Sequence, residues 1–170
     1  SQTNLRLLRE VQPTIVRGNA GEIGALIGAG GEVRGVESVG GPEKPLEAAA
    51  EAARQWSATV AITGVRDFIS DGHRAIFVDN GSRWLTTLTG TGCTATTVIA
   101  AFAAVEPDSL IAAAGALCCL GYAAELAEQQ AHGPGSFKMA LYDHLYNLTG
   151  EALALGARAD WLKDGGVTGP

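Results

Sequence analysis

The sequence predicts an α/β protein in which a layered sheet is followed by a C-terminal layer of helices. Three observations lead to this fold class. Short β-branched runs alternate with helical patterns in the first half of the chain, alanine-rich helical segments fill the second half, and glycine turns separate these elements. The chain has 170 residues, of which 46% are hydrophobic, so it can bury a core, and we expect one domain over residues 1–170.

Helical and strand-like segments alternate through the first half of the chain. Leucines at positions 5, 7 and 8 give an amphipathic helix, and the Thr-Ile-Val run behind Pro13 is typical of a buried parallel strand. Asp71 and Gly72 form a turn signal between two apolar runs, which indicates a β-hairpin. In chain order we expect a helix over 4–11, a strand over 14–16, a helix over 20–27, a glycine-rich loop over 28–41, a helix after Pro42, a strand over 59–62, and hairpin arms over 68–70 and 73–78 joined by a two-residue turn.

The second half is predicted to be almost entirely helical after one strand-like run. Asp108 and Ser136 follow Pro107 and Gly135, and both are residue types that cap helix N-termini. The expected elements are a strand over 83–88 and helices over 94–105, 108–131, 136–149 and 151–162. A parallel sheet of four or five strands leaves an edge uncovered, and the chain starts in a helix, so we expect the fold to be incomplete at the N-terminus.

Charge and composition exclude several classes of protein. A net charge of −6 at pH 7 and a pI near 5.0 argue against a nucleic-acid-binding surface. The cysteines are not spaced as a disulfide framework, and residues 1–10 are too charged for a signal peptide. The longest apolar stretch, residues 110–124, is short and interrupted by glycine, so we expect no membrane span. These features favour a cytoplasmic protein.

The Thr-Gly-Thr-Gly-Cys segment over 89–93 is the strongest candidate for a functional site. It lies between the strand-like run and a helical run, where unpaired N–H groups and the helix dipole favour an anion. The same field favours the ionised form of a thiol, so Cys93 is placed where a reactive sulfur could lie beside a phosphate. The alternative is a packing turn in which Cys93 is an inert core thiol.

Three polar residues follow other predicted strands. Arg17 provides a fixed positive charge that suits a polyphosphate, although a surface salt bridge explains it equally well. Glu22 could serve a magnesium ion, but Asn19 and Glu22 also have the spacing of a helix capping box. Thr63 could bind a phosphate through its hydroxyl, or it could be part of a simple turn at the strand end. Because these residues and the 89–93 turn all follow predicted strands, we expect them on one rim of the sheet, where ligands bind in α/β proteins.

Four segments in this order resemble the hydroxyethylthiazole kinase family. They are the run from Pro13 to Ile23, the Thr63-Gly64 strand end, the Thr89 to Cys93 turn, and the Gly133-Pro134-Gly135-Ser136-Phe137 segment. The eleven-residue first segment is highly specific, and the match covers nearly the whole chain. The resemblance implies a ribokinase-like fold, a homotrimer, and phosphorylation of 4-methyl-5-(2-hydroxyethyl)thiazole with ATP and Mg²⁺ in thiamine biosynthesis or salvage.

The resemblance also implies roles for individual residues. Arg17 and Thr63 would contact ATP, Glu22 would serve the magnesium ion, and Gly90 would contact the thiazole substrate. Cys93 stands where related sugar and pyrimidine kinases place an aspartate base, so it would lie beside the alcohol to be activated. The anion hole over the transferring phosphoryl group would consist of Gly90, Thr91, Gly92 and Cys93.

The family also carries an N-terminal portion before the Pro13 segment, and most of it is missing from this sequence. That portion holds a substrate-contacting methionine loop and an acidic magnesium residue. We therefore expect the chain to be the C-terminal part of such a kinase. Two alternatives stay open: a non-catalytic fragment that binds nucleotide or assembles through its helices, and a ribokinase-like kinase for another small alcohol. Cys93 in place of aspartate argues against a sugar or pyrimidine kinase.

Overall fold

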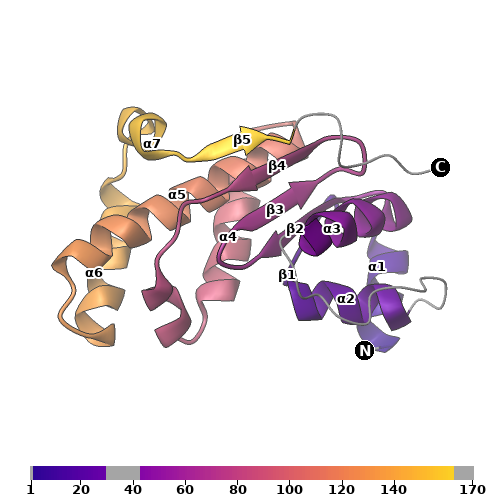
Figure 1. The fold of residues 1–170 in the computed structure, drawn as a ribbon, viewed down its shortest axis with the longest axis horizontal. Helices are drawn as coiled ribbons and strands as arrows, with labels where there is room; N and C mark the ends of the chain where they lie inside the picture. The colour runs from indigo at the N-terminus through magenta and orange to yellow at the C-terminus, as the bar shows by residue number, and fades with distance from the viewer. Residues whose placement is uncertain (1, 30–42, 163–170) are drawn as a thin grey trace. The chain divides into compact units, whose positions relative to one another are not determined.

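The computed structural model describes residues 2–29 and 43–162, and it confirms an α/β protein (Figure 1). Its strands form one sheet in the order β1-β2-β3-β4-β5. The chain divides into two compact units. The first runs to Phe77 and includes Trp161 and Leu162, and the second covers residues 78–160.

The first unit contains the alternating elements that the sequence predicts. The glycine-rich loop expected over 28–41 lies, from residue 30 onward, outside the described residues, and residues 28 and 29 belong to a helix. The elements are α1 (Gln2–Val11), β1 (Ile15–Asn19), α2 (Ala20–Ala29), α3 (Glu43–Trp56), β2 (Thr59–Thr63), β3 (Asp67–Ser70) and β4 (Ala75–Val78).

The core of the first unit lies between the sheet and two helices, α2 and α3. Strands β1 and β2 are parallel, with Ile15 opposite Thr59 and Asn19 opposite Thr63. Strand β3 runs antiparallel to β2. Small alanines on α3 let this helix lie close to the strands. The buried side chains that form this core are Ile23, Ile27, Ala48, Ala49, Ala52, Ala53, Val60 and Ile62.

Gly18 permits the close packing of β1 against α2. A Cβ atom at this position would lie 3.0 Å from Ile23 Cδ1 and 3.2 Å from Glu22 Cβ. Both contacts are tighter than ordinary van der Waals distances, so a larger residue would require the Ile23 and Glu22 side chains to shift. This glycine therefore sets how closely the first turn of α2 follows the end of β1.

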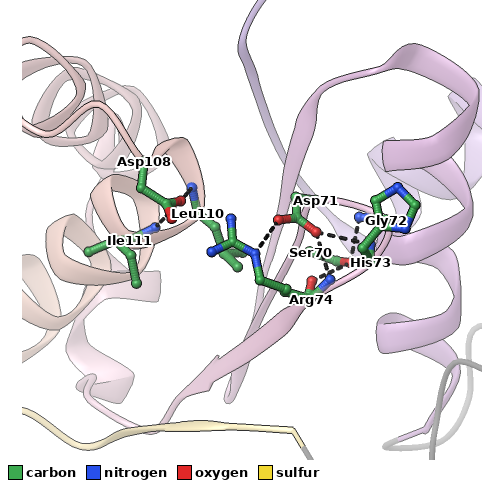
Figure 2. Close-up of polar contacts among 8 residues, drawn as sticks. All are labelled: Ser70, Asp71, Gly72, His73, Arg74, Asp108, Leu110 and Ile111. Carbon is green, nitrogen blue, oxygen red and sulfur yellow. Dashed lines mark hydrogen bonds and ion pairs between the residues drawn. The ribbon is translucent and has the colours of Figure 1, made fainter. Parts of the chain in front are cut away.

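The predicted hairpin is confirmed, but its connection is longer than expected (Figure 2). Four residues, rather than two, join β3 to β4. Asp71 Oδ1 accepts the backbone N–H groups of His73 at 2.9 Å and Arg74 at 2.6 Å, and Asp71 Oδ2 accepts a hydrogen bond from Arg74 Nε at 2.8 Å. The buried Ser70 hydroxyl donates to the Arg74 carbonyl and accepts the Gly72 N–H. These side chains satisfy the backbone groups of the longer loop.

The second unit is mainly helical, as predicted. Asp108 caps its longest helix by accepting the N–H groups of Leu110 at 3.0 Å and Ile111 at 3.4 Å (Figure 2). The elements are η1 (Arg83–Thr87, a 3₁₀ helix), α4 (Thr91–Ala103), α5 (Ser109–Gln130), α6 (Pro134–Asn147), α7 (Gly150–Gly156) and β5 (Ala159–Trp161), whose last residue belongs to the first unit.

The strand expected over 83–88 is wrong, because this segment forms the η1 helix. The Ser82 hydroxyl caps the helix by accepting the Trp84 N–H at 3.1 Å. The hydroxyls of Thr86 and Thr87 donate to the carbonyls of Arg83 and Trp84, three residues back. Local side-chain hydrogen bonds of this kind compete with strand pairing. The 89–93 turn therefore follows a 3₁₀ helix and not a strand.

Two further expectations for the second half are corrected. The last helix does not extend over 151–162: α7 ends at Gly156, and residues 159–161 form β5, which is held by the Leu162 N–H donating to the Ala75 carbonyl at 3.0 Å. Ser136 is not the N-cap of α6, because Gly133 occupies that position. Ser136 sits in the first turn instead, and its hydroxyl accepts the N–H groups of His132 and Gly133.

Helix α5 is longer than the apolar stretch suggested by the sequence. With 22 residues it is long and apolar enough to cross a membrane by length and composition alone, because its glycines do not interrupt it. However, 67% of its most apolar 18-residue stretch is buried inside the protein. A core helix has the same composition, so this helix is weak support for a membrane span.

Candidate functional site

Arg17 and Thr63 form the centre of the candidate site in the first unit. The Arg17 guanidinium donates from Nη2 to the Thr63 hydroxyl oxygen. The Thr63 hydroxyl in turn lies 3.5 Å from the Gly18 carbonyl. Two residues that the sequence singled out separately are therefore in direct contact at the ends of two parallel strands.

Strand register explains this contact. Arg17 is paired with Ala61, and Thr63 is paired with Asn19. Paired residues on neighbouring strands share a face of the sheet, and so do residues two apart on one strand. Arg17 and Thr63 therefore lie on the same face, and the long arginine side chain spans the two-residue offset. This face is the one opposite Val60 and Ile62, which pack against α2 and α3.

The Arg17 guanidinium is not neutralised by a salt bridge. Among the side chains that the structure describes, no carboxylate forms an ion pair with it, and its buried Nε atom has no hydrogen-bond partner there. The surface salt bridge that the sequence left open is therefore not formed within the described chain. A guanidinium with spare donors is suited to bind the oxygens of a phosphate.

Glu22 takes part in the capping box that the sequence left open. Its Oε2 atom accepts the Asn19 N–H at 2.8 Å, and the Asn19 side-chain oxygen accepts the Glu22 N–H at 2.8 Å. This pair starts α2 directly after β1. Glu22 is an exposed residue, and no described residue donates a hydrogen bond to its other carboxylate oxygen, Oε1. The cap is confirmed, while the magnesium role stays a prediction.

Asp67 is a candidate residue that the sequence reasoning missed. It starts β3, its side chain is buried, and its Oδ1 atom accepts the Gly64 N–H at 2.9 Å. Burial raises the pKa of Asp67 to about 6, although the Gly64 N–H and the positive charge of Arg17 act in the opposite direction. A buried carboxyl group with a strongly raised pKa is characteristic of functional sites. The signal in the sequence was an aspartate opening a strand, where this residue is disfavoured.

The Gly90–Cys93 segment forms the start of α4 in the second unit. Gly90 is the N-cap and has a φ of 94°, a left-handed conformation that glycine adopts without steric cost. No side chain caps this helix. The N–H groups of Thr91, Gly92 and Cys93 therefore have no acceptor within the helix, as at any helix N-terminus. Cys93 is exposed, so its thiol is not the buried core group of the alternative interpretation.

The structure thus joins some of the predicted residues and leaves others separate. Arg17 and Thr63 are in contact, and Glu22 lies in the first turn of α2, the helix that follows β1. Gly90–Cys93 belongs to the other unit. That this segment shares one rim of the sheet with Arg17, Glu22 and Thr63 therefore stays a prediction. Within the described residues, no group of three or more histidines, cysteines, aspartates or glutamates is placed to hold a metal ion.

Comparison with known proteins identifies the family. The model of the hydroxyethylthiazole kinase family matches residues 1–151. The chain is 63% identical over 158 residues to a hydroxyethylthiazole kinase of Roseiflexus sp. (strain RS-1), a match that covers 93% of this chain and 58% of the relative. It is 55% identical over 163 residues to one of Desulforudis audaxviator (strain MP104C), covering 96% of this chain and 60% of the relative.

A solved structure gives the same result. The hydroxyethylthiazole kinase protein from Pyrococcus horikoshii OT3 superimposes with a TM-score of 0.83 at 36% identity, over 96% of this chain and 61% of that one. This similarity confirms the ribokinase-like fold class expected from the sequence. The chain spans less than two thirds of the length of these relatives. It belongs to the hydroxyethylthiazole kinase family.

Proposed function

We propose that this protein transfers the γ-phosphoryl group of ATP to the hydroxyl group of 4-methyl-5-(2-hydroxyethyl)thiazole, as part of thiamine biosynthesis or salvage. The observation that carries the proposal is the Arg17–Thr63 pair in a chain of this family. A guanidinium without a carboxylate partner, held by a hydroxyl at the ends of parallel strands, is suited to bind a polyphosphate.

In this proposal, Arg17 and Thr63 bind ATP. The arginine contributes charge and several donors to phosphate oxygens, and the Thr63 hydroxyl limits how far the guanidinium can rotate. Phosphoryl transfer depends mainly on positioning and on charge stabilisation, so holding the donor phosphates in place is a large part of catalysis.

Glu22 is the described residue that best fits a magnesium ion carried by the nucleotide. Mg²⁺ usually keeps several waters and binds through one or two carboxylates together with substrate phosphates. The free Oε1 atom of Glu22 suits such a site, since Oε2 is used by the cap. When bound, the ion supplies positive charge to the phosphate oxygens.

The N-terminus of α4 is proposed as the anion hole. Its unpaired N–H groups at Thr91, Gly92 and Cys93 favour negative charge at the transferring phosphoryl group, and Gly90 contacts the thiazole. In the transfer step, the substrate oxygen forms a bond to the γ-phosphorus as the bond to the ADP oxygen breaks. The hydroxyl proton passes to the Cys93 sulfur in its thiolate form, so Cys93 acts as general base.

Several wider features belong to the same proposal. The two units form one kinase domain, the active protein is a homotrimer in the cytoplasm, and its ligands are ATP, Mg²⁺ and the thiazole alcohol. Membership of the family supports these assignments. The exposed thiol at Cys93 favours the thiazole alcohol over the substrates of a sugar or pyrimidine kinase, because those relatives use an aspartate base.

A substrate panel tests the proposal. ADP release is measured with ATP and Mg²⁺ in the presence of the thiazole alcohol, a hydroxymethylpyrimidine or ribose, and ATP binding is measured separately by calorimetry. The proposal predicts ADP release that depends on the thiazole alcohol alone. ATP binding without turnover on any alcohol would favour the non-catalytic alternative, and turnover on the pyrimidine or ribose would favour a different kinase.

A further inference from the structure

Asp67 lies on the sheet beside the two residues proposed to hold ATP. In the antiparallel pair of β2 and β3, Ile62 is opposite Phe68, so the next step of the same register places Asp67 opposite Thr63. Opposite residues share a face, and Arg17 is on that face as well. Three polar side chains from three adjacent strands therefore gather on one face, near the end of β2.

The Asp67 carboxylate fixes the turn that follows Thr63. Its Oδ1 atom accepts the Gly64 N–H at 2.9 Å, three residues back along the chain. This bond closes the connection between β2 and β3 directly after the proposed ATP residue. Thr63 is therefore held from two sides, by Arg17 through its hydroxyl and by Asp67 through the next peptide.

Capping a turn explains only part of this arrangement. Asp71 caps the neighbouring hairpin loop, where its charge is neutralised by direct contact with Arg74 at 2.8 Å. Asp67 is only 9% exposed, and it has no direct ion pair or second hydrogen bond within the described chain. The positive charge of Arg17 acts on this carboxyl group and lowers its pKa, against the larger effect of burial. A simple turn cap needs neither burial nor a nearby guanidinium.

The positive charge of Arg17 explains why a buried carboxylate is placed at position 67. Arg17 and Asp67 are both partly desolvated, and neither forms an ion pair with another described side chain. Opposite charges attract more strongly when they are out of water. The Arg17 guanidinium therefore favours the ionised form of Asp67, and the Asp67 carboxylate stabilises the guanidinium where it lies. Asp67 leaves the guanidinium donors free for phosphate, since it acts on Arg17 through its field and not through a hydrogen bond.

We infer that Asp67 is a positioning residue of the proposed ATP site, which fixes the Thr63–Gly64 turn and keeps the Arg17 guanidinium oriented toward the nucleotide phosphates. The inference rests on the proposed function, since it takes Arg17 and Thr63 as the ATP contacts. Asp67 itself does not touch the nucleotide. Its removal therefore weakens ATP binding through Arg17 and Thr63.

The test compares Asp67→Asn with Asp71→Asn as a matched control. Asparagine at position 67 keeps an oxygen for the Gly64 N–H but removes the charge that acts on Arg17. Asp71 is a carboxylate of the same hairpin that also accepts backbone N–H groups, and it has no role in the proposed site. The dissociation constant of ATP with Mg²⁺ is measured by calorimetry, and the Tm is measured for each variant.

Asp67→Asn is expected to weaken ATP binding at least tenfold while its Tm is equal to or above that of the wild type. Asp71→Asn is expected to lower the Tm and leave ATP binding unchanged. ATP binding by Asp67→Asn within twofold of the wild type overturns the inference, and so does a wild type that binds no ATP. If the wild type binds ATP but phosphorylates no alcohol, the proposed function fails while the binding comparison still decides the role of Asp67.

A second measurement on the wild type applies even if Asp67→Asn does not fold. In heteronuclear NMR spectra, the Gly64 amide and Arg17 Nε–H signals are followed as ATP is added. Both are expected to shift, while the His73 amide, bound by Asp71, stays in place. Unchanged Gly64 and Arg17 signals at saturating ATP overturn the inference.

Discussion

The Arg17 guanidinium donates a hydrogen bond to the hydroxyl of Thr63, and this contact links two residues that are 46 positions apart in the sequence. It joins the end of β1 to the end of β2 on the face of the sheet that α2 and α3 do not cover. The contact restricts the arginine side chain before any ligand binds. Preorganisation of this kind lowers the entropy cost of binding a charged group.

Arg17→Lys tests the need for a guanidinium at this position. Lysine keeps the charge but is a compact point charge, so it cannot bond to Thr63 and to phosphate oxygens in the same fixed geometry. We expect the KM for ATP to rise about tenfold or more, equivalent to about 1.4 kcal/mol. Arg54→Lys is the matched control, because Arg54 contacts the Gly72 carbonyl in the same unit and has no role in the site. Equal KM values for Arg17→Lys and the wild type would contradict the proposed ATP contact.

Cys93→Ala separates catalysis from nucleotide binding. Loss of a general base slows turnover by about 10²–10⁴ without removing the backbone groups that bind phosphate. We expect a lower kcat with an unchanged dissociation constant for ATP. Cys119→Ala serves as the control thiol, since burial raises the pKa of Cys119 and it is not at a helix N-terminus. A full kcat in Cys93→Ala would exclude the sulfur as the base.

Glu22→Gln distinguishes the capping role of this residue from its proposed magnesium role. Glutamine at the third helical position still completes a capping box with Asn19, so the Tm should change little. The carboxylate charge is lost, so the Mg²⁺ concentration needed for half-maximal activity should rise. Glu22→Ala removes both functions, and it should also lower stability by about 1 kcal/mol. The same Mg²⁺ dependence in Glu22→Gln and the wild type would contradict the magnesium role and leave helix capping as the role of Glu22.

The buried carboxyl group of Asp67 makes stability depend on pH. Burial raises its folded-state pKa from 3.8 to about 6, so the folded protein binds more protons than the unfolded chain between these values. The stability contributed by the protonated group is present below pH 3.8 and is lost as the pH rises through about 6. An asparagine side chain does not ionise, so at pH 8 the Asp67→Asn variant should be more stable than the wild type by up to about 3 kcal/mol.

This difference is measured by urea unfolding of both proteins at pH 5 and pH 8. The advantage of Asp67→Asn should be smaller at the lower pH, because part of the wild-type population is then protonated. An advantage of the same size at both pH values would show that Asp67 does not titrate in this range.

Asn80 holds together several segments of the second unit. Its side chain is 4% exposed, donates to Glu125 Oε1 at 3.1 Å and to the Gly156 carbonyl at 2.9 Å, and accepts the Arg158 N–H at 2.6 Å. Asn80→Ala leaves buried partners unsatisfied, which should cost about 2–3 kcal/mol in the free energy of unfolding. Asn147→Ala is the control, because Asn147 is exposed and its side chain donates to the Asp143 carbonyl within its own helix. Equal losses in the two variants would argue against a structural role for Asn80.

Local signals in the sequence were sufficient for most of the first unit. The Thr-Ile-Val run and the Asn19–Glu22 spacing predicted a parallel strand and a capped helix, and both are present. Each of these two elements is determined by residues that are close together in the sequence. The Arg17–Thr63 contact could not be predicted in the same way, because it depends on the register between strands that are distant in sequence.

The errors occurred where tertiary contacts override local preference. The 83–88 segment has the composition of a strand, but Trp84 packs against Phe137 of α6 with ring centroids 5.8 Å apart, and threonine hydroxyls satisfy the nearby carbonyls. Strand β5 is three residues long and exposed, so it has no hydrophobic alternation to detect. Asp67 was missed because its importance comes from burial and from Arg17, neither of which is visible in the sequence.

Phosphorylation of the thiazole alcohol with Cys93 as the base is tested by the rate of ADP release from the wild type and from Cys93→Ala, measured with saturating ATP and Mg²⁺ and increasing thiazole alcohol. We predict a wild-type rate that rises with the alcohol and saturates, and a rate about a hundredfold or more lower in Cys93→Ala. A wild-type rate that does not respond to the thiazole alcohol would contradict the account.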